Sequence, residues 1–227
     1  MEVKKIDVVS NTHWDREFRF SFEKTRHNLL VMLDTTLDIL ESDKNYHSFT
    51  MDGHSIMIDD YLEMRPERRE QVEKFIKLGR LIIGPYYTLP EEFTISHEAL
   101  IRNLIFGRET VEKYGGKVPT VGYTPSSWGQ TGQYPQILKD FGINYMMFYR
   151  GISHHEAPAE YIWKAPDGTS VLASRFALYC RYNWYYQVHR SVSRNRVWSK
   201  DYKWGEFDEA PFRRADGFIG PSINYDL

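Results

Sequence analysis

The apolar residues of the chain alternate between helix-like spacing and short strand-like runs. Between residues 22 and 40 five leucines recur at intervals that place them on one face of a helix. Two shorter helices are expected before Gly79, the second beginning at Pro66, because proline is favoured in a first helical turn. Ser96 is expected to cap a further helix, and residues 133–141 to form another.

Short β-branched or aromatic runs between these helices predict strands. The runs are residues 5–10, 47–51, 80–84, 120–123 and 144–149. Two more runs, 161–164 and 170–175, flank Asp167-Gly168, a dipeptide typical of hairpin turns. Strands that alternate with helices predict an α/β fold with a mostly parallel sheet.

Polar clusters follow several of the predicted strands. They are His13-Trp14-Asp15, Asp52, residues 125–127 and Arg150. The carboxyl ends of parallel strands meet at one edge of a sheet, where the chemistry of such folds collects. We therefore expect His13, Asp15, Ser126 and Arg150 to lie together at one edge.

Composition excludes some classes of function. With 41% apolar and 26% charged residues, and no apolar run near the roughly 18 residues of a membrane helix, the chain is expected to be soluble. The net charge of −2 gives no indication of a nucleic-acid or membrane partner. Cys180 is the only cysteine, so no internal disulfide can form, and no signal-peptide pattern opens the chain. The expected location is the cytoplasm.

Aromatic residues are frequent, at 15% of the chain. They can serve core packing or stack on the apolar faces of sugar rings, and composition does not separate the two. The segment after Phe176 is rich in Tyr, Trp and Arg but has no clear period. We expect residues 1–176 to form the main domain and 177–227 to continue it.

The triplet His13-Trp14-Asp15 can be read as half of a metal site. Residues two apart in an extended segment point to the same side, so an imidazole and a carboxylate can converge on one cation. Nitrogen and oxygen ligands suit zinc. A hydrogen-bonded polar pair at a strand end is the alternative.

The surroundings of this triplet resemble a known family. Residues 11–17, NTHWDRE, resemble the segment N-x-H-W-D-R-E-W that opens bacterial members of glycoside hydrolase family 38, the α-mannosidases. Five further stretches are similar to family segments in the same order: 51–63 (MDGH…DDYLE), 79–87 (GRLIIGPYY), 100–104 (LIRNL), 122–137 (GYTPSSWGQTGQYPQI) and 161–169 (YIWKAPDGT). The agreement is collinear over residues 5–175, which makes it highly specific.

The resemblance implies a seven-stranded β/α barrel of the glycoside hydrolase/deacetylase type, of which this chain would be a part, with one zinc ion at the strand ends. His13 and Asp15 match two of the family's zinc ligands. A third ligand is the catalytic aspartate, the nucleophile, and a fourth is a histidine farther along. Arg150 and Phe18 match groups expected to contact the sugar.

The sequence departs from the family at the nucleophile. Position 126 is serine, and Pro125 and Gly129 fix the register so that no neighbouring carboxylate can take its place. A neutral hydroxyl binds zinc weakly and is a poor nucleophile without a base. With two recognisable ligands, zinc binding is expected to be weak or absent. The tempting substitutes, residues 154–156 (HHE) and 208–209 (DE), are more typical of solvated charged residues.

Three hypotheses follow. The first is a truncated or degenerate α-mannosidase-like hydrolase, related to retaining zinc enzymes but inactive by itself. The second is a non-catalytic carbohydrate-binding module that uses Phe18, Arg150 and the aromatic tail. The third is a deacetylase-like metal hydrolase, for which the usual H-x-x-x-H pair is missing. Expected partners are a mannoside or another carbohydrate, and a second chain or copy, since five parallel strands leave a seven-stranded barrel incomplete.

Overall fold

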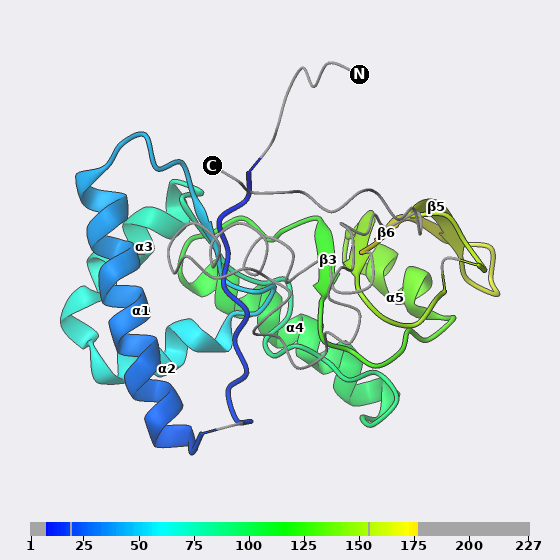
Figure 1. Ribbon diagram of the computed structural model, residues 1–227, viewed down its shortest axis with the longest axis horizontal. Helices are drawn as coiled ribbons and strands as arrows, with labels where there is room; N and C mark the ends of the chain where they lie inside the picture. The colour runs from blue at the N-terminus through cyan, green and yellow to red at the C-terminus, as the bar shows by residue number, and fades with distance from the viewer. Residues whose placement is uncertain (1–7, 19, 154, 177–227) are drawn as a thin grey trace, which may run out of the picture. The chain divides into compact units, whose positions relative to one another are not determined.

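Figure 1 shows a computed structural model of the chain, which describes residues 8–176 except 19 and 154. Contacts divide the described residues into two compact units. The first unit holds the residues up to Tyr123 with Asp140–Ile143, and the second holds Thr124–Lys139 and the residues from Asn144 onward.

The first unit is mainly helical, as the apolar spacing predicts. Its helices are α1 (Phe22–Ser42), α2 (Ile56–Met64), the 3-10 helix η1 (Pro66–Arg68), α3 (Arg69–Lys77) and α4 (His97–Lys113). Four of the five predicted leucines of α1, Leu29, Leu33, Leu37 and Leu40, are buried in one core with residues of α2 and α3, and the fifth, Leu30, is only partly buried against it. Ser96 caps α4 as predicted, because its hydroxyl accepts a hydrogen bond from the backbone N–H of Ala99 at 3.1 Å.

A short parallel sheet lies beside these helices. It pairs β1 (Phe49–Thr50) with β2 (Leu81–Ile82), and Asn11 adds a parallel bridge to Thr50. The regular part of β1 is shorter than the predicted 47–51, and the backbone beyond it turns at Asp52, where φ is 44°. The pairing places the segment before His13 and the end of β1 side by side.

Only part of the predicted strand over residues 5–10 lies within the described residues. Residues 5–7 lie outside the described residues, and Val8 and Val9 are exposed and form no regular strand. The pairing next to β1 is made two residues later, by Asn11. The β-branched run thus predicted the correct part of the chain for this pairing but not the residue that pairs.

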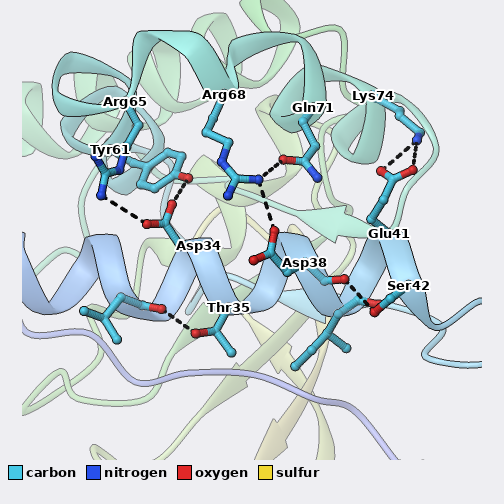
Figure 2. A network of polar contacts seen from close by, with 12 residues as sticks. Asp34, Thr35, Asp38, Glu41, Ser42, Tyr61, Arg65, Arg68, Gln71 and Lys74 are labelled. Carbon is cyan, nitrogen blue, oxygen red and sulfur yellow. Dashed lines mark hydrogen bonds and ion pairs between the residues drawn. The ribbon is translucent and has the colours of Figure 1, made fainter.

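Polar contacts join α1 to the helices that follow β1 (Figure 2). Asp34 accepts a hydrogen bond from the Tyr61 hydroxyl at 2.6 Å and forms an ion pair with Arg65 at 3.3 Å. Two further pairs continue along α1: Asp38 with Arg68 at 3.1 Å, and Glu41 with Lys74 at 2.7 Å. The three acidic residues are spaced four and three apart, so they share one face of the helix.

The second unit holds the predicted hairpin and the helix before it. Its elements are α5 (Tyr134–Asp140, whose last residue belongs to the first unit), β4 (Tyr145–Phe148), β5 (Glu160–Lys164) and β6 (Ser170–Arg175), and β3 (Val121–Thr124) leads into it. β6 pairs with β5 in antiparallel and with β4 in parallel orientation. Trp163 of β5 packs against Tyr134 and Phe148, with ring centroids 6.3 and 5.8 Å away.

The predicted α/β class is confirmed as a mixed α/β fold with parallel and antiparallel pairs. The seven-stranded barrel stays a prediction, as does the division at residue 176, beyond which the chain lies outside the described residues. Within the described part of the chain, no helix is long and apolar enough to cross a membrane.

Candidate functional site

The His13–Asp15 pair lies where the chain leaves its pairing with β1. The backbone N–H of Thr12 donates to the carbonyl of Thr50 at 3.3 Å, and the triplet follows at once. Nε2 of His13 lies 3.3 Å from Oδ1 of Asp15, and both side chains are partly exposed. Zinc bonds of about 2.0–2.1 Å in a tetrahedral site separate two ligand atoms by about 3.3 Å. This spacing fits two ligands of one zinc ion as well as a direct ion pair between the two side chains.

Asp52 lies next to His13 and is fully buried. Its Oδ2 accepts a hydrogen bond from the backbone N–H of Trp14 at 2.8 Å and lies 3.0 Å from Nδ1 of His13. Gly53, with a φ of 76°, follows, and a Cβ there would lie 3.0 Å from the carbonyl oxygen of Tyr123. The sequence placed Asp52 at a strand end but gave it no role, since no spacing rule links it to the triplet.

The pKa values of the two histidines next to Asp52 are shifted in opposite directions. Burial opposes the charge of His13, but hydrogen bonds and charges from Asp15 and Asp52 outweigh it and raise the pKa of His13 to about 9. Burial lowers the pKa of His54 to about 4, so its imidazole is neutral at neutral pH. His13 is thus the cationic partner of the buried carboxylate.

Arg16 holds the other end of the loop that carries His13. Its guanidinium donates two hydrogen bonds to the carboxylate of Asp60 on α2, at 2.8 and 2.9 Å, and lies over the ring of Phe22. A bidentate pair of this kind adds geometric specificity to charge attraction. The loop that carries His13 is therefore held at both ends, by Asp52 and by Asp60.

The second unit holds the other candidate residues. Arg150, after β4, donates a hydrogen bond from Nη1 to the carbonyl oxygen of Ser126 at 2.6 Å. Its guanidinium lies 4.1 Å from the ring centroid of Trp128 and 4.8 Å from that of Tyr149. The structure thus brings Ser126 and Arg150 together within this unit. Their approach to the His13–Asp15 pair stays a prediction.

Hydrogen bonds inside the loop after Ser126 keep its shape. The side-chain amide of Gln130 donates to the Ser127 hydroxyl at 2.9 Å, which in turn donates to the carbonyl of Gly129 at 2.9 Å. Ser127 is buried, so its hydroxyl serves the loop rather than a ligand. No signal in the sequence distinguished the structural Ser127 from Ser126 except the family register.

The remaining candidates are less organised. Phe18 is 73% exposed in the described loop of the first unit. Glu156 accepts a hydrogen bond from the backbone N–H of Ser153 at 2.8 Å, a local turn contact, while His154 and residues 208–209 lie outside the described residues. Within the described ranges, no group of three or more His, Cys, Asp or Glu side chains could hold a metal ion.

Comparison with known proteins decides the family. The model of the "Glycosyl hydrolases family 38 N-terminal domain" matches residues 4–206. This chain belongs to that family. It is 40% identical over 194 residues to the "Putative mannosylglycerate hydrolase" of Halalkalibacterium halodurans, and the match covers 80% of this chain and 21% of that protein. It is 27% identical over 173 residues to alpha-mannosidase G of Dictyostelium discoideum, covering 74% of this chain and 16% of that protein.

Solved structures agree with the family assignment. An alpha-mannosidase from Enterococcus faecalis V583 is similar with a TM-score of 0.71 and 37% identity, over 74% of this chain and 19% of that one. A 4-alpha-glucanotransferase from Thermococcus litoralis shares the fold alone, with a TM-score of 0.59 and 15% identity over 82% of this chain and 30% of that one. The chain spans about a fifth of the length of the curated relatives it matches.

Proposed function

We propose that this chain supplies part of a zinc site that binds α-mannosides, with Nε2 of His13 and a carboxylate oxygen of Asp15 as two ligands. The observation that carries the proposal is the 3.3 Å between these atoms, the separation expected for two ligands in one tetrahedral shell. The family assignment supports it. When bound, zinc would hold neighbouring sugar hydroxyls in a fixed arrangement, and this would ease distortion of the sugar ring.

Arg150 and Phe18 are the groups that would hold the sugar. The guanidinium of Arg150 is fixed by the Ser126 carbonyl and by the ring of Trp128, and only one of its five N–H donors is used in this hydrogen bond. The other donors suit sugar hydroxyls. The exposed ring of Phe18 suits stacking on the apolar face of a pyranose.

Ser126 limits what the chain can do by itself. A retaining glycosidase needs a carboxylate nucleophile about 5 Å from the acid that protonates the leaving oxygen. Among the described residues of the second unit, no carboxylate or imidazole makes a hydrogen bond with the Ser126 hydroxyl, so nothing there activates it as a nucleophile. We therefore infer that this chain alone binds mannosides but does not hydrolyse them.

The names of the relatives support the proposed substrate class. One is named for mannosylglycerate hydrolysis and two for α-mannosidase activity. We propose α-mannosides as ligands, with α-mannosylglycerate as the first compound to assay. A pure carbohydrate-binding role is the second candidate, and it is favoured by the serine at the nucleophile position combined with the organised Arg150.

The decisive experiment combines zinc calorimetry with a hydrolysis assay on an aryl α-mannoside and on α-mannosylglycerate. The wild-type chain should bind zinc weakly and show no hydrolysis above buffer. Ser126→Asp should tighten zinc binding by at least about tenfold, or ~1.4 kcal/mol, because it restores a third ligand, and Ser126→Asn should not. Hydrolysis by the wild type that is lost in His13→Ala would overturn the inactive assignment. Failure of both wild type and Ser126→Asp to bind zinc would overturn the zinc site.

A further inference from the structure

Asp52 lies at the centre of the contacts that hold the His13–Asp15 pair. Its buried Oδ2 accepts the backbone N–H of Trp14 at 2.8 Å and lies 3.0 Å from Nδ1 of His13. The first contact fixes the peptide between the two side chains of the pair, and the second fixes the ring of His13. One carboxylate oxygen therefore controls both.

We propose that Asp52 is the residue that positions His13 as a metal ligand. It does so by keeping a proton on Nδ1, which leaves Nε2 as the nitrogen whose lone pair can bind the metal once its own proton has left. Nε2 is the nitrogen that faces Asp15, at 3.3 Å. This inference rests on the proposed zinc site, and it deepens that proposal by naming the binding nitrogen and the group that selects it.

The surroundings of Asp52 support this role over a simple structural one. Within the described part of the chain its carboxylate has ion-pair contacts only with His13 and, at 3.9 Å, with His54, and its Oδ1 has no hydrogen-bond partner. Burying a carboxylate with so few partners is unfavourable. Its φ of 44° lies in the left-handed region, which aspartate and asparagine adopt more readily than other residues with a side chain. This backbone conformation and the burial of the carboxylate coincide at the residue that touches His13.

A competing explanation is that Asp52 merely anchors the loop through Trp14. The chain offers a matched control for this, because Asp60 anchors the same loop through Arg16 and makes no contact with His13. Loss of a loop anchor should have the same effect at either position. Loss of the positioning group should have an effect at Asp52 alone.

Two substitutions separate the roles of the carboxylate. Asp52→Gly removes it and accepts a φ of 44° without strain. Asp52→Asn tolerates the same backbone and can keep an oxygen where Oδ2 lies, so it retains the acceptor and loses the charge. The full 227-residue chain should be used for all variants.

The first measurement needs no metal. With nitrogen-15 in the histidine rings, the Nδ1–H proton of His13 should give a slowly exchanging, downfield signal in the wild type. We expect Asp52→Asn, which keeps the acceptor, and Asp60→Ala, which removes the other loop anchor, to keep the signal and Asp52→Gly to lose it. A signal that is missing in the wild type, survives in Asp52→Gly, or is lost equally in Asp60→Ala would overturn the positioning role.

The second measurement is zinc calorimetry on the same proteins. Asp52→Gly should bind zinc about 10–100-fold more weakly than the wild type, the usual effect of removing a group that orients a ligand, and Asp52→Asn and Asp60→Ala should stay within a few-fold. Equal zinc affinity in the wild type and Asp52→Gly would refute the role of Asp52 while leaving the zinc site intact. No zinc uptake by either the wild type or Ser126→Asp would instead refute the zinc site, and the ring signal would still decide whether Asp52 holds His13.

Discussion

Nε2 of His54 lies 3.9 Å from Oδ2 of Asp52, and neither ring nitrogen of His54 makes a hydrogen bond to any described residue. The ring is buried, and burial lowers the pKa of His54 to about 4. The unfolded chain binds a proton at this histidine near pH 6.5, whereas the folded chain does not until about pH 4. The contribution of His54 to stability is therefore present above pH 6.5 and is lost as the pH falls toward 4.

We predict that His54→Gln, which removes the titratable ring, removes part of the acid sensitivity of the chain. Between pH 7 and pH 4.5 the wild type should lose about 2 kcal/mol more of its unfolding free energy than the variant. Urea unfolding at the two pH values measures this. The exposed His27, replaced by Gln, is the control and should behave like the wild type. If His54→Gln and the wild type lost the same unfolding free energy between the two pH values, His54 would not be a buried neutral histidine.

The helices and the hairpin could be predicted from the sequence because their signals are local. Leucine spacing in α1, the Ser96 cap of α4 and the Asp167-Gly168 turn each depend on residues close in the chain. Strand lengths were less predictable, since two-residue strands such as β1 are set by pairing with distant segments.

The candidate site shows the same division. The sequence singled out His13 and Asp15, because their spacing of two is itself a signal. Asp52 lies 39 residues beyond His13 and contacts it only through the parallel pairing of Asn11 with Thr50. The burial of His54 with few polar partners could not be predicted either, because burial depends on the packing of the whole unit.

A second prediction concerns Gly107, inside α4. A Cβ at this position would lie 2.1 Å from the carbonyl oxygen of Pro85 and 2.5 Å from the carbonyl carbon of Tyr86. Alanine in a helix interior is ordinarily better than glycine by about 1 kcal/mol. Here the clash with backbone should outweigh that gain, and Gly107→Ala should destabilise the chain by about 1–3 kcal/mol or more.

Thermal and urea unfolding of Gly107→Ala test this packing. Gly132→Ala is the matched control, because a Cβ there meets nothing within 4 Å, and its unfolding free energy should stay within about 0.5 kcal/mol of the wild type. A stabilised Gly107→Ala variant would mean that α4 does not approach the Pro85 segment this closely.

A third prediction separates two contacts of Figure 2 that look alike. The Tyr61 hydroxyl donates a 2.6 Å hydrogen bond to the carboxylate of Asp34, and the Tyr61 side chain is buried. The Lys74–Glu41 pair is as short, at 2.7 Å, but both side chains are half exposed. Tyr61→Phe should lower the unfolding free energy by about 1–3 kcal/mol, as expected for a hydrogen bond to a charged group.

Lys74→Met should change the unfolding free energy by less than about 1 kcal/mol, since exposed ion pairs contribute little. Salt provides a second test of the contrast. Raising the ionic strength should erase the effect of Lys74→Met, because exposed charges are screened, and leave that of Tyr61→Phe nearly unchanged. Equal effects for the two substitutions would mean that burial does not decide their strength.

The last prediction concerns self-association, which the sequence led us to expect. Tyr145 of β4, Leu172 of β6 and Ile162 of β5 are direct neighbours across the three strands. They are 48%, 43% and 67% exposed, so they form an apolar row on one face of the sheet. Such a row favours contact with another apolar surface. We predict that the chain self-associates through it and that Leu172→Lys, which places a charge at its centre, weakens the association.

Sedimentation at increasing concentration should give an average mass above that of the monomer for the wild type and a lower mass for Leu172→Lys. Val31→Lys is the control, because it adds the same charge at an exposed apolar residue of α1, in the first unit, and it should associate as the wild type does. A wild type that stays monomeric at high concentration would contradict the prediction. Equal loss of association in both variants would point to net charge rather than to the row on the sheet, because added like charge opposes association wherever it lies.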